Sequence, residues 1–353
     1  MNKSVLQFLR NTLLYLLLTT PLAAQVPFEC TGEFFLSITD FGSSTQFYRV
    51  TVDNVTEEAT FDGLTNRGNL PLNAIGYRST DNFIYAINPA TNQLVQVDAS
   101  GSVFPLSVVN LAPNYGYFGA DITPDGELMV LTGNDNGGSR VLTGIDLTDP
   151  TYPVVFTRNL STTGSIVNCT DIAFQPSTER LFGFDSNAHR LVEINLETGV
   201  VNTNLFPISN VADRMGALFF NAFGELFGYG NAFGSPTATD FFGIDTETGE
   251  ITVNATGPSA PGKDGCSCPY TFILNKTVSQ PFAFPCTEVL YTFRIGNQGT
   301  DIPDARIIDE MPVGLRITEI VENPFGGNIL SGVGTNTLDI ENITILNGDN
   351  ELV

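Results

Sequence analysis

A single histidine and a few aspartates are the residues of this chain whose types could support chemistry. The only histidine, His189, lies between Asn187 and Arg190 in a predicted turn. A Ser-His-Asp triad needs a histidine beside a serine nucleophile and a buried acid, and the sequence contains no Gly-x-Ser-x-Gly motif. We therefore interpret His189 as a solvated turn residue and predict no catalytic residue.

Three aspartates offer a different chemistry, the binding of a cation. Asp121, Asp171 and Asp264 stand at or near equivalent positions of a pattern that repeats along the chain. Ca²⁺ favours six to eight oxygen ligands from carboxylates, carbonyls and water. Two other copies of the pattern have Ala74 and Ala217 at this position. The sequence thus offers Ca²⁺ as a candidate ligand of an incomplete aspartate ring, and it predicts no other cofactor.

The repeated pattern itself indicates the fold. Each copy contains a short apolar strand, a turn, a second apolar strand, a turn, and an alternating strand that ends in an acid or Asn. The copies lie 47, 50, 46 and 48 residues apart when they are anchored on Ile75, Ile122, Ile172, Leu218 and Cys266. A period in the forties that contains about four strands indicates a propeller blade. The predicted fold class is therefore all-β.

The two ends of this repeat region complete each other. The N-terminal copy has strands over residues 34–38, 46–52 and 60–61 but lacks the first, innermost strand. Residues 262–270 have the position of a first strand, with no blade after it. Pairing the two would remove open sheet edges, which otherwise invite aggregation. We predict a five-bladed β-propeller over residues 28–271 that is closed by strand exchange.

The five cysteines suggest how this closure could be locked. Cys30 precedes the second strand of the first blade, and Cys266 and Cys268 lie on the strand predicted to be its first. We predict a disulfide between Cys30 and Cys268, with Cys266 as the alternative partner. Such a bridge would close a loop of more than 200 residues, worth about 4–5 kcal/mol in the chain-entropy model. Cys286 could instead reach Cys266, which would leave Cys169 free and buried.

The first 24 residues are typical of a secretory signal peptide. Lys3 and Arg10 charge its front, leucines dominate residues 13–18, and residues 21–24 end in small side chains. The apolar run is too short for a membrane-spanning helix. We therefore expect a secreted or cell-surface protein that is not inserted in the membrane after signal cleavage. The formal charge of −23 argues against nucleic acid and anionic membranes as partners.

A second pattern begins after residue 271. Residues 274–278, 289–299, 305–315 and 337–346 read as successive strands of an antiparallel sandwich. The predicted second domain covers residues 272–353. The chain stops near the point where a last strand should begin, so this domain is either truncated or followed by further chain.

Two resemblances to known families accompany these patterns. Lys276–Val278 and residues 291–299 and 308–315 resemble the conserved repeat domain of bacterial surface proteins (domain-of-unknown-function family eleven), although Cys286 stands where that family usually has Gly. This resemblance implies an immunoglobulin-like β-sandwich that serves as a stalk. Residues 30–37 and 264–269 are similar to a secreted bacterial propeller family (domain-of-unknown-function family 6923), which implies no reaction.

Together these features favour a non-enzymatic exported bacterial protein. A propeller head would bind or adhere to an extracellular protein or glycan, and an immunoglobulin-like module would space it from the cell. The sequence identifies no ligand-binding residue. The alternative function is a carbohydrate-binding or hydrolytic propeller with a cation-assisted site at its central channel.

Overall fold

In the residues that it describes, the computed structural model of this chain contains 26 β-strands. It describes residues 25–353 except for residues 31, 40–44, 53–57, 65–70, 107–109, 113–114, 135–139, 163–166, 236–238, 260–261, 270–271, 281, 283 and 298–300. The predicted signal peptide over residues 1–24 lies outside the described residues. Within the described part, no helix has the length and apolar character needed to cross a membrane.

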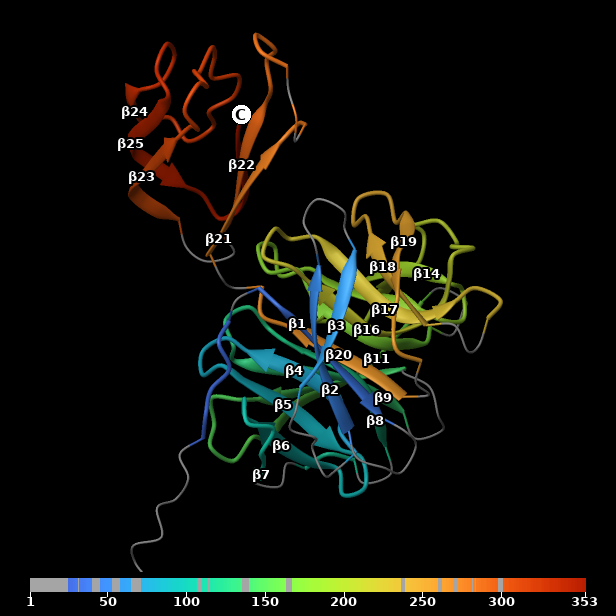
Figure 1. The fold of residues 1–353 in the computed structure, drawn as a ribbon. Helices are drawn as coiled ribbons and strands as arrows, with labels where there is room; N and C mark the ends of the chain where they lie inside the picture. Colours follow the sequence, from blue (N-terminus) through green and yellow to red (C-terminus); the bar gives the residue numbers. More distant parts are fainter. Residues whose placement is uncertain are drawn as a thin grey trace, which may run out of the picture.

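Twenty strands form five four-stranded antiparallel sheets that resemble propeller blades (Figure 1). The first blade contains β20 (Gly262–Ser267), β1 (Phe34–Thr39), β2 (Thr45–Val52) and β3 (Ala59–Gly63). The second contains β4 (Asn73–Arg78), β5 (Phe83–Asn88), β6 (Gln93–Val97) and β7 (Val103–Pro105). The third contains β8 (Gly116–Ile122), β9 (Leu128–Asn134), β10 (Val141–Asp146) and β11 (Val154–Asn159). The fourth contains β12 (Cys169–Phe174), β13 (Leu181–Asp185), β14 (Arg190–Ile194) and β15 (Val201–Asn202). The fifth contains β16 (Ala212–Phe220), β17 (Leu226–Ala232), β18 (Thr239–Ile244) and β19 (Ile251–Thr256).

The end of the repeat region supplies the innermost strand of the first blade. β20 pairs antiparallel with β1, which places Phe34 opposite Ser267 and Phe35 opposite Cys266. The predicted exchange of strands between the two ends is confirmed. Because β1 would otherwise present an unpaired edge, this pairing gives the first blade the same four strands as its neighbours.

Neighbouring blades share apolar cores, and five such cores follow one another around a ring. They join blades one and two, two and three, three and four, four and five, and five and one. The last of these is rich in phenylalanine, and the ring centres of Phe34 and Phe219 lie 5.1 Å apart in it. Blades covered on both faces have continuous apolar strands, and all five residues of β13 are buried. Because the last of these cores joins blade five to blade one, the five blades form a closed ring.

Two glycines let the innermost strands approach one another closely. A Cβ placed on Gly265 of β20 would lie 2.1 Å from a ring carbon of Phe219. A Cβ placed on Gly119 of β8 would lie 2.4 Å from Oδ1 of Asp171. A side chain at either position would push adjacent blades apart, so these glycines set how narrow the centre of the ring is.

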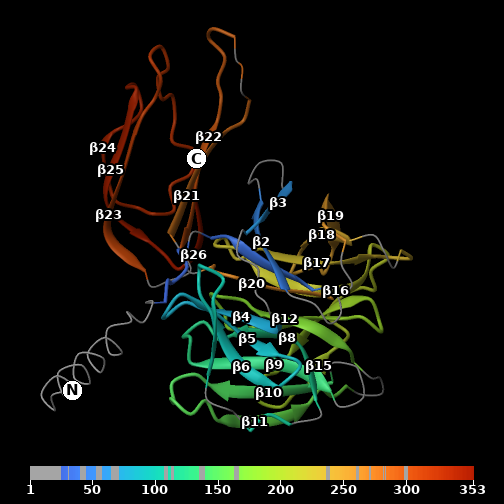
Figure 2. The ribbon, with the colours of Figure 1, turned by 60° about the horizontal axis from the view of Figure 1, so that its bottom comes forward.

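Residues 272–353 form a second domain made of two sheets (Figure 2). One sheet contains β21 (Phe272–Val278), β22 (Tyr291–Asn297) and β26 (Gly348–Leu352). The other contains β23 (Ile302–Glu310), β25 (Thr337–Ile345) and β24 (Asn328–Ser331). Apolar side chains from both sheets form a single core, so the two sheets face each other.

The second domain contacts the fifth blade directly. Arg294 of β22 donates to Oε1 of Glu225 at 2.8 Å, and its guanidinium lies 4.2 Å from the ring centre of Phe223. A Cβ placed on Gly296 would lie 2.4 Å from the carbonyl oxygen of Ala222. Glycine at this position therefore allows the two backbones to touch, and the domains are joined by packing as well as by the chain.

Candidate functional site

The three aspartates that were predicted as cation ligands lie on innermost strands. Asp121 is on β8, Asp171 on β12 and Asp264 on β20. Asp171 and Asp264 are buried, whereas Asp121 is half-buried. The structure therefore brings all three to the central part of the ring.

Each of these carboxylates accepts a hydrogen bond from a backbone amide of the next blade. The pairs are Asp264 Oδ2 with Ile75 N at 2.9 Å, Asp121 Oδ2 with Phe174 N at 2.7 Å, and Asp171 Oδ2 with Leu218 N at 2.7 Å. Buried amides need such partners. The aspartates thus tie neighbouring blades together, a role that the sequence analysis did not assign to them.

Burial raises the pKa of all three carboxyl groups. It raises the pKa of Asp121 to about 7, although two backbone amides oppose the shift. The pKa of Asp171 is raised well above its usual range by burial and then by the charge of Asp264. The pKa of Asp264 is also raised well above its usual range, chiefly by burial. Burial therefore disfavours the charged form of both Asp171 and Asp264.

One carboxylate oxygen of these three aspartates has no hydrogen-bond partner in the part of the chain that the structure describes. Oδ1 of Asp171 is buried and makes no hydrogen bond with any described residue. An unpaired buried oxygen is costly unless water or a cation satisfies it. In the described part of the chain, no group of three or more acidic, cysteine or histidine side chains is arranged to hold a metal ion. The channel Ca²⁺ site stays a prediction, and this oxygen is the one atom that favours it.

His189 lies in a turn, as predicted, but it is half-buried rather than solvated. Its φ is 52°, and its Nδ1 lies 3.0 Å from the carbonyl oxygen of Asp213. Its ring packs edge-on against Phe233, with ring centres 5.2 Å apart. These contacts, together with a hydrogen bond from the backbone amide of Ser209 to the carbonyl oxygen of His189 at 2.6 Å, fix the position of the turn.

The acids that end the third strand of a blade have a structural role. Oδ1 of Asp245 accepts from the amides of Glu247 and Thr248, and Oδ1 of Asp146 accepts from the amide of Thr148. These hydrogen bonds lower the pKa of Asp245 below its usual value. Carboxylates that cap their own turns in this way explain why an acid recurs once per blade.

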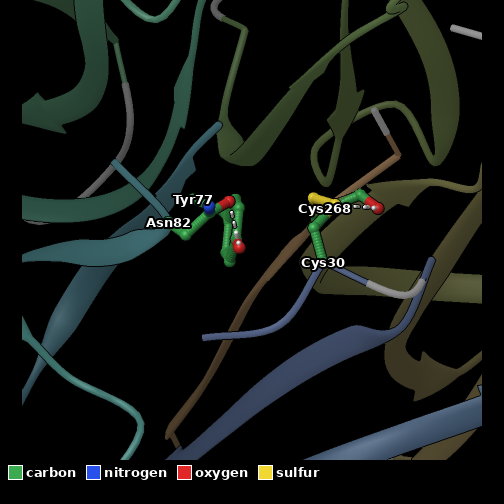
Figure 3. Close-up of a disulfide and its surroundings, with 4 residues drawn as sticks. All are labelled: Cys30, Tyr77, Asn82 and Cys268. Carbon is green, nitrogen blue, oxygen red and sulfur yellow. Dashed lines mark hydrogen bonds between the residues drawn. A yellow bond between two sulfur atoms is a disulfide. The ribbon is translucent and has the colours of Figure 1, made fainter. Parts of the chain in front are cut away.

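A disulfide joins the two ends of the ring where the first blade closes (Figure 3). Cys30 and Cys268 are bonded, with their Cα atoms 5.5 Å apart and a sequence separation of 238. This pairing confirms the predicted one, and the alternative with Cys266 is wrong. Because Cys266 lies opposite Phe35 in the strand pair, its side chain enters the core between blades one and two.

The remaining cysteines are free. Cys169 is buried, as predicted, and Cys266 is buried as well. Cys286 is exposed on the loop between β21 and β22, so the suggested pairing of Cys286 with Cys266 is wrong. Burial raises the pKa of Cys169 and of Cys266 well above the usual value, which leaves both as unreactive thiols.

The ring has two faces, which we name by the direction of its innermost strands. The start face is formed where β4, β8, β12, β16 and β20 begin, and the finish face is formed where they end. The disulfide follows the end of β20, and the turn that contacts the second domain follows the end of β16. The second domain therefore adjoins the finish face (Figure 1).

Polar contacts between successive innermost strands line the start face. Nδ2 of Asn73 donates to the carbonyl oxygen of Tyr117 at 3.0 Å, and Oγ1 of Thr170 donates to the carbonyl oxygen of Met215. The aromatic cluster Tyr115–Phe118 also lies here, and Tyr117 is buried in the core between blades two and three. Tyr117 of this cluster therefore serves in packing, and its ring is not exposed for a ligand to stack on.

Two cations on the start face were not singled out from the sequence. Lys263 lies near the beginning of β20, and its Nζ donates to Oδ1 of Asn231 at 2.8 Å. Arg214 lies near the beginning of β16 and is exposed. The two residues are far apart in the chain, so only the closed ring brings them to the same gap between blades. The sequence feature that could have pointed to this pair is Lys263 itself, a lysine inside a predicted innermost strand of an acidic chain.

One protein family matches most of the chain. The family is described as a repeat of unknown function (DUF6923), and the match covers residues 35–270. The chain belongs to the DUF6923 family. The predicted resemblance of the first domain is therefore confirmed, and the DUF6923 domain spans the ring from β1 to β20.

Solved structures of low sequence identity resemble the DUF6923 domain only loosely. Hydrazine synthase of Kuenenia stuttgartiensis is 13% identical, with 66% of this chain and 68% of that chain covered and a TM-score of 0.40. A putative 6-phosphogluconolactonase from Bacteroides uniformis is 13% identical, with 65% and 82% covered and a TM-score of 0.39. A streptogramin B lyase is 12% identical, with 67% and 72% covered and a TM-score of 0.37. No curated protein matches the chain.

The second domain, which lies beyond the DUF6923 match, contains a groove of about 190 Å³. Apolar side chains of both sheets line it, among them Tyr291, Phe293, Leu338 and Leu352. Residues 315–321 form one of its walls. The groove is thus the partly open interior of the sandwich.

Proposed function

We propose that this protein is an exported bacterial binding protein. Its DUF6923 domain is the head that binds or adheres to an extracellular protein or glycan, and the second domain is an immunoglobulin-like spacer of the conserved repeat type. The head acts without catalysis. It is released or displayed at the cell surface after removal of residues 1–24.

The observation that carries this proposal is the disulfide between Cys30 and Cys268. Disulfides persist in oxidising compartments and are rare in the bacterial cytoplasm. The bridge joins residues 238 positions apart at the closure of the ring, where a stable crosslink is most useful. Together with the signal-like first 24 residues, it supports export.

The arrangement of the two faces supports a role in binding. The spacer and the disulfide are on the finish face, which leaves the start face turned away from whatever holds the second domain. Asp121, Asp171 and Asp264 are engaged with backbone amides, and His189 is engaged with Asp213. These engagements favour a structural function for the groups that a hydrolase would need.

Export can be tested by expressing the full chain in a bacterial host and separating the cell fractions. We expect to find the protein outside the cytoplasm, with an N-terminus near Gln25. Its intact mass should be the one calculated for the mature chain with one disulfide formed. A variant that lacks residues 1–24 serves as the control and should stay in the cytoplasm. A cytoplasmic full-length chain with reduced Cys30 and Cys268 would contradict the proposal.

A carbohydrate-binding or hydrolytic function with a channel cation is the second candidate. The unpaired Oδ1 of Asp171 is the observation that favours it. Ca²⁺ that binds the folded state should raise the unfolding temperature of the wild-type protein. It should leave the unfolding temperature of Asp171→Asn unchanged. An equal response of both proteins, or no response, would remove this candidate.

A further inference from the structure

Lys263 and Arg214 face the same gap between the fifth and the first blade. Met215 packs in the core shared by blades four and five, so its neighbour Arg214 points to the opposite face of the sheet, toward blade one. Arg214 lies directly opposite Asn231 on β17, and directly opposed residues share a face. Because Asn231 accepts the hydrogen bond of Lys263, all three side chains meet in this gap.

A glycine allows the two strands to come together here. A Cβ placed on Gly216 of β16 would lie 2.9 Å from the carbonyl oxygen of Lys263. The register of β16 with β17 also shifts between Met215 and Ala217, which is a β-bulge. Bulges often redirect side chains at functional positions. The backbone is therefore shaped to bring the two cations to the start face.

Neither cation is neutralised by a carboxylate in the part of the chain that the structure describes. Among the described residues, no carboxylate forms an ion pair with Lys263 or Arg214. Six other cations have such partners, namely Arg49, Arg78, Arg180, Lys276, Arg294 and Arg306. The chain has 38 acidic residues and 15 lysines and arginines. Arg140, Arg158, Arg190 and Arg316 also form no ion pair with a described carboxylate. Lys263 and Arg214 are in addition close enough together for their positive charges to repel each other.

The electrostatics of Lys263 are consistent with a missing negative partner. Its pKa is lowered to about 8, first by burial and then by the positive charge of Arg214. A half-buried ammonium beside a guanidinium is disfavoured unless an anion lies between or next to them. A bound anion would relieve both the burial and the repulsion.

We propose that Lys263 and Arg214 form a binding site for an oxyanion group of a ligand, such as a carboxylate, sulfate or phosphate. The planar guanidinium of Arg214 can hold two oxygens of the group side by side, and Lys263 adds a point charge and further donors. The site lies on the start face, on the opposite side of the ring from the second domain. It therefore points in the direction proposed for ligand recognition.

This site specifies the chemistry of the ligand in the proposed binding function, and its biological role rests on that proposal. Anion binding by Lys263 and Arg214 can nevertheless be tested separately from export. Binding is measured with the purified mature chain, whereas export is measured in cell fractions. A failure of either experiment leaves the outcome of the other unaffected.

The test titrates the mature chain with inorganic phosphate, inorganic sulfate and glucuronate by calorimetry at low ionic strength, where charge interactions are least screened. We expect at least one of the three to bind. Arg214→Gln and Lys263→Gln should each weaken that binding by about tenfold or more, as loss of a charge-assisted hydrogen bond does. The preferred probe identifies the ligand source as a phosphorylated, sulfated or carboxylated molecule.

Arg316→Gln is the matched control, because Arg316 is an exposed cation of the second domain without a carboxylate partner among the described residues. Its binding should equal that of the wild-type chain. Binding of none of the three probes, or an equal loss in the control, would overturn the proposal. Arg214 is exposed, so Arg214→Gln should fold, and circular dichroism checks this for each variant.

Discussion

The β-sheets of the ring and those of the second domain differ in how many of their faces are covered by other parts of the protein. In the ring each blade is covered on both faces by its neighbours, because five cores follow one another without a gap. In the second domain each sheet has one covered face, and even that cover is incomplete. Leu274 of β21 is 57% exposed, although it lies opposite Ile295, which is 1% exposed.

This difference shows what closure contributes. Opposed residues of an antiparallel pair lie on the same face, so Leu274 and Ile295 would be buried together if the facing sheet were wide enough. The facing sheet covers the central strand β22 and leaves the edge strand β21 open. In the ring the innermost strands are also the edge strands of their sheets, but the neighbouring blades cover both of their faces. The stability of the ring should therefore depend on keeping it closed.

The largest effect should come from opening the ring. Replacing both Cys30 and Cys268 with Ser should lower the free energy of unfolding by about 4 kcal/mol, because the bridge closes a very long loop. Urea denaturation of the oxidised protein measures this loss. Cys286→Ser is the control, since Cys286 is free and exposed, and it should have no effect. A double variant as stable as the wild type would mean that the cores alone keep the ring closed.

The second effect compares the same residue type in the two regions. Phe219→Ala should cost about 3–4 kcal/mol, because Phe219 is 1% exposed in the core between blades five and one. Phe284→Ala should change stability by less than about 0.5 kcal/mol, because Phe284 is 86% exposed on the loop between β21 and β22. Thermal unfolding distinguishes the two. Similar losses in both variants would show that the loop is buried against another surface in solution.

The smallest effect concerns the response to pH. The pKa of Asp121 in the folded ring is raised to about 7, chiefly by burial, above its value in the unfolded chain. Its contribution to stability is therefore full below about pH 4 and is lost as the pH rises to about 7. The free energy of unfolding of the wild type should fall relative to that of Asp121→Asn over this range. The expected fall is about 2 kcal/mol, roughly half of what the full pKa shift would give, because Asp121 is half-buried and solvent screens its charge. Urea denaturation at three pH values measures the difference.

Asp339 of the second domain provides the opposite case. A hydrogen bond from Arg306 lowers its pKa, so its contribution is present above the unfolded pKa and is lost as the pH falls. Asp339→Asn should therefore approach the wild type in stability at low pH. If the stability of Asp121→Asn and that of Asp339→Asn, each relative to the wild type, changed with pH in the same direction, the raised pKa of Asp121 would be wrong.

The ring could be predicted from the sequence because its repeat is regular and its ends are complementary. Ile75, Ile122 and Ile172 mark equivalent strands, and the missing first strand of blade one pointed to residues 262–270 as its replacement, of which Gly262–Ser267 form β20. The disulfide followed from the same argument. The choice between Cys266 and Cys268 needed the register with Phe35, which alternation along a single strand does not provide.

The candidate sites were harder to predict because they depend on contacts between blades. An aspartate on an innermost strand can face the channel or bind the next blade, and only the structure shows that Asp264 binds the amide of Ile75. Lys263 and Arg214 are neighbours through the closed ring alone. The contact of Gly296 with Ala222 is equally invisible in a pattern of strands.

The pairing of β20 with β1 also sets the order of events during synthesis. The ribosome makes β1 first, but the partner of β1 emerges only after more than 200 further residues. Until then the largely apolar strand β1 has no innermost neighbour, and the first blade stays incomplete. Closure of the ring therefore cannot take place until β20 has been synthesised.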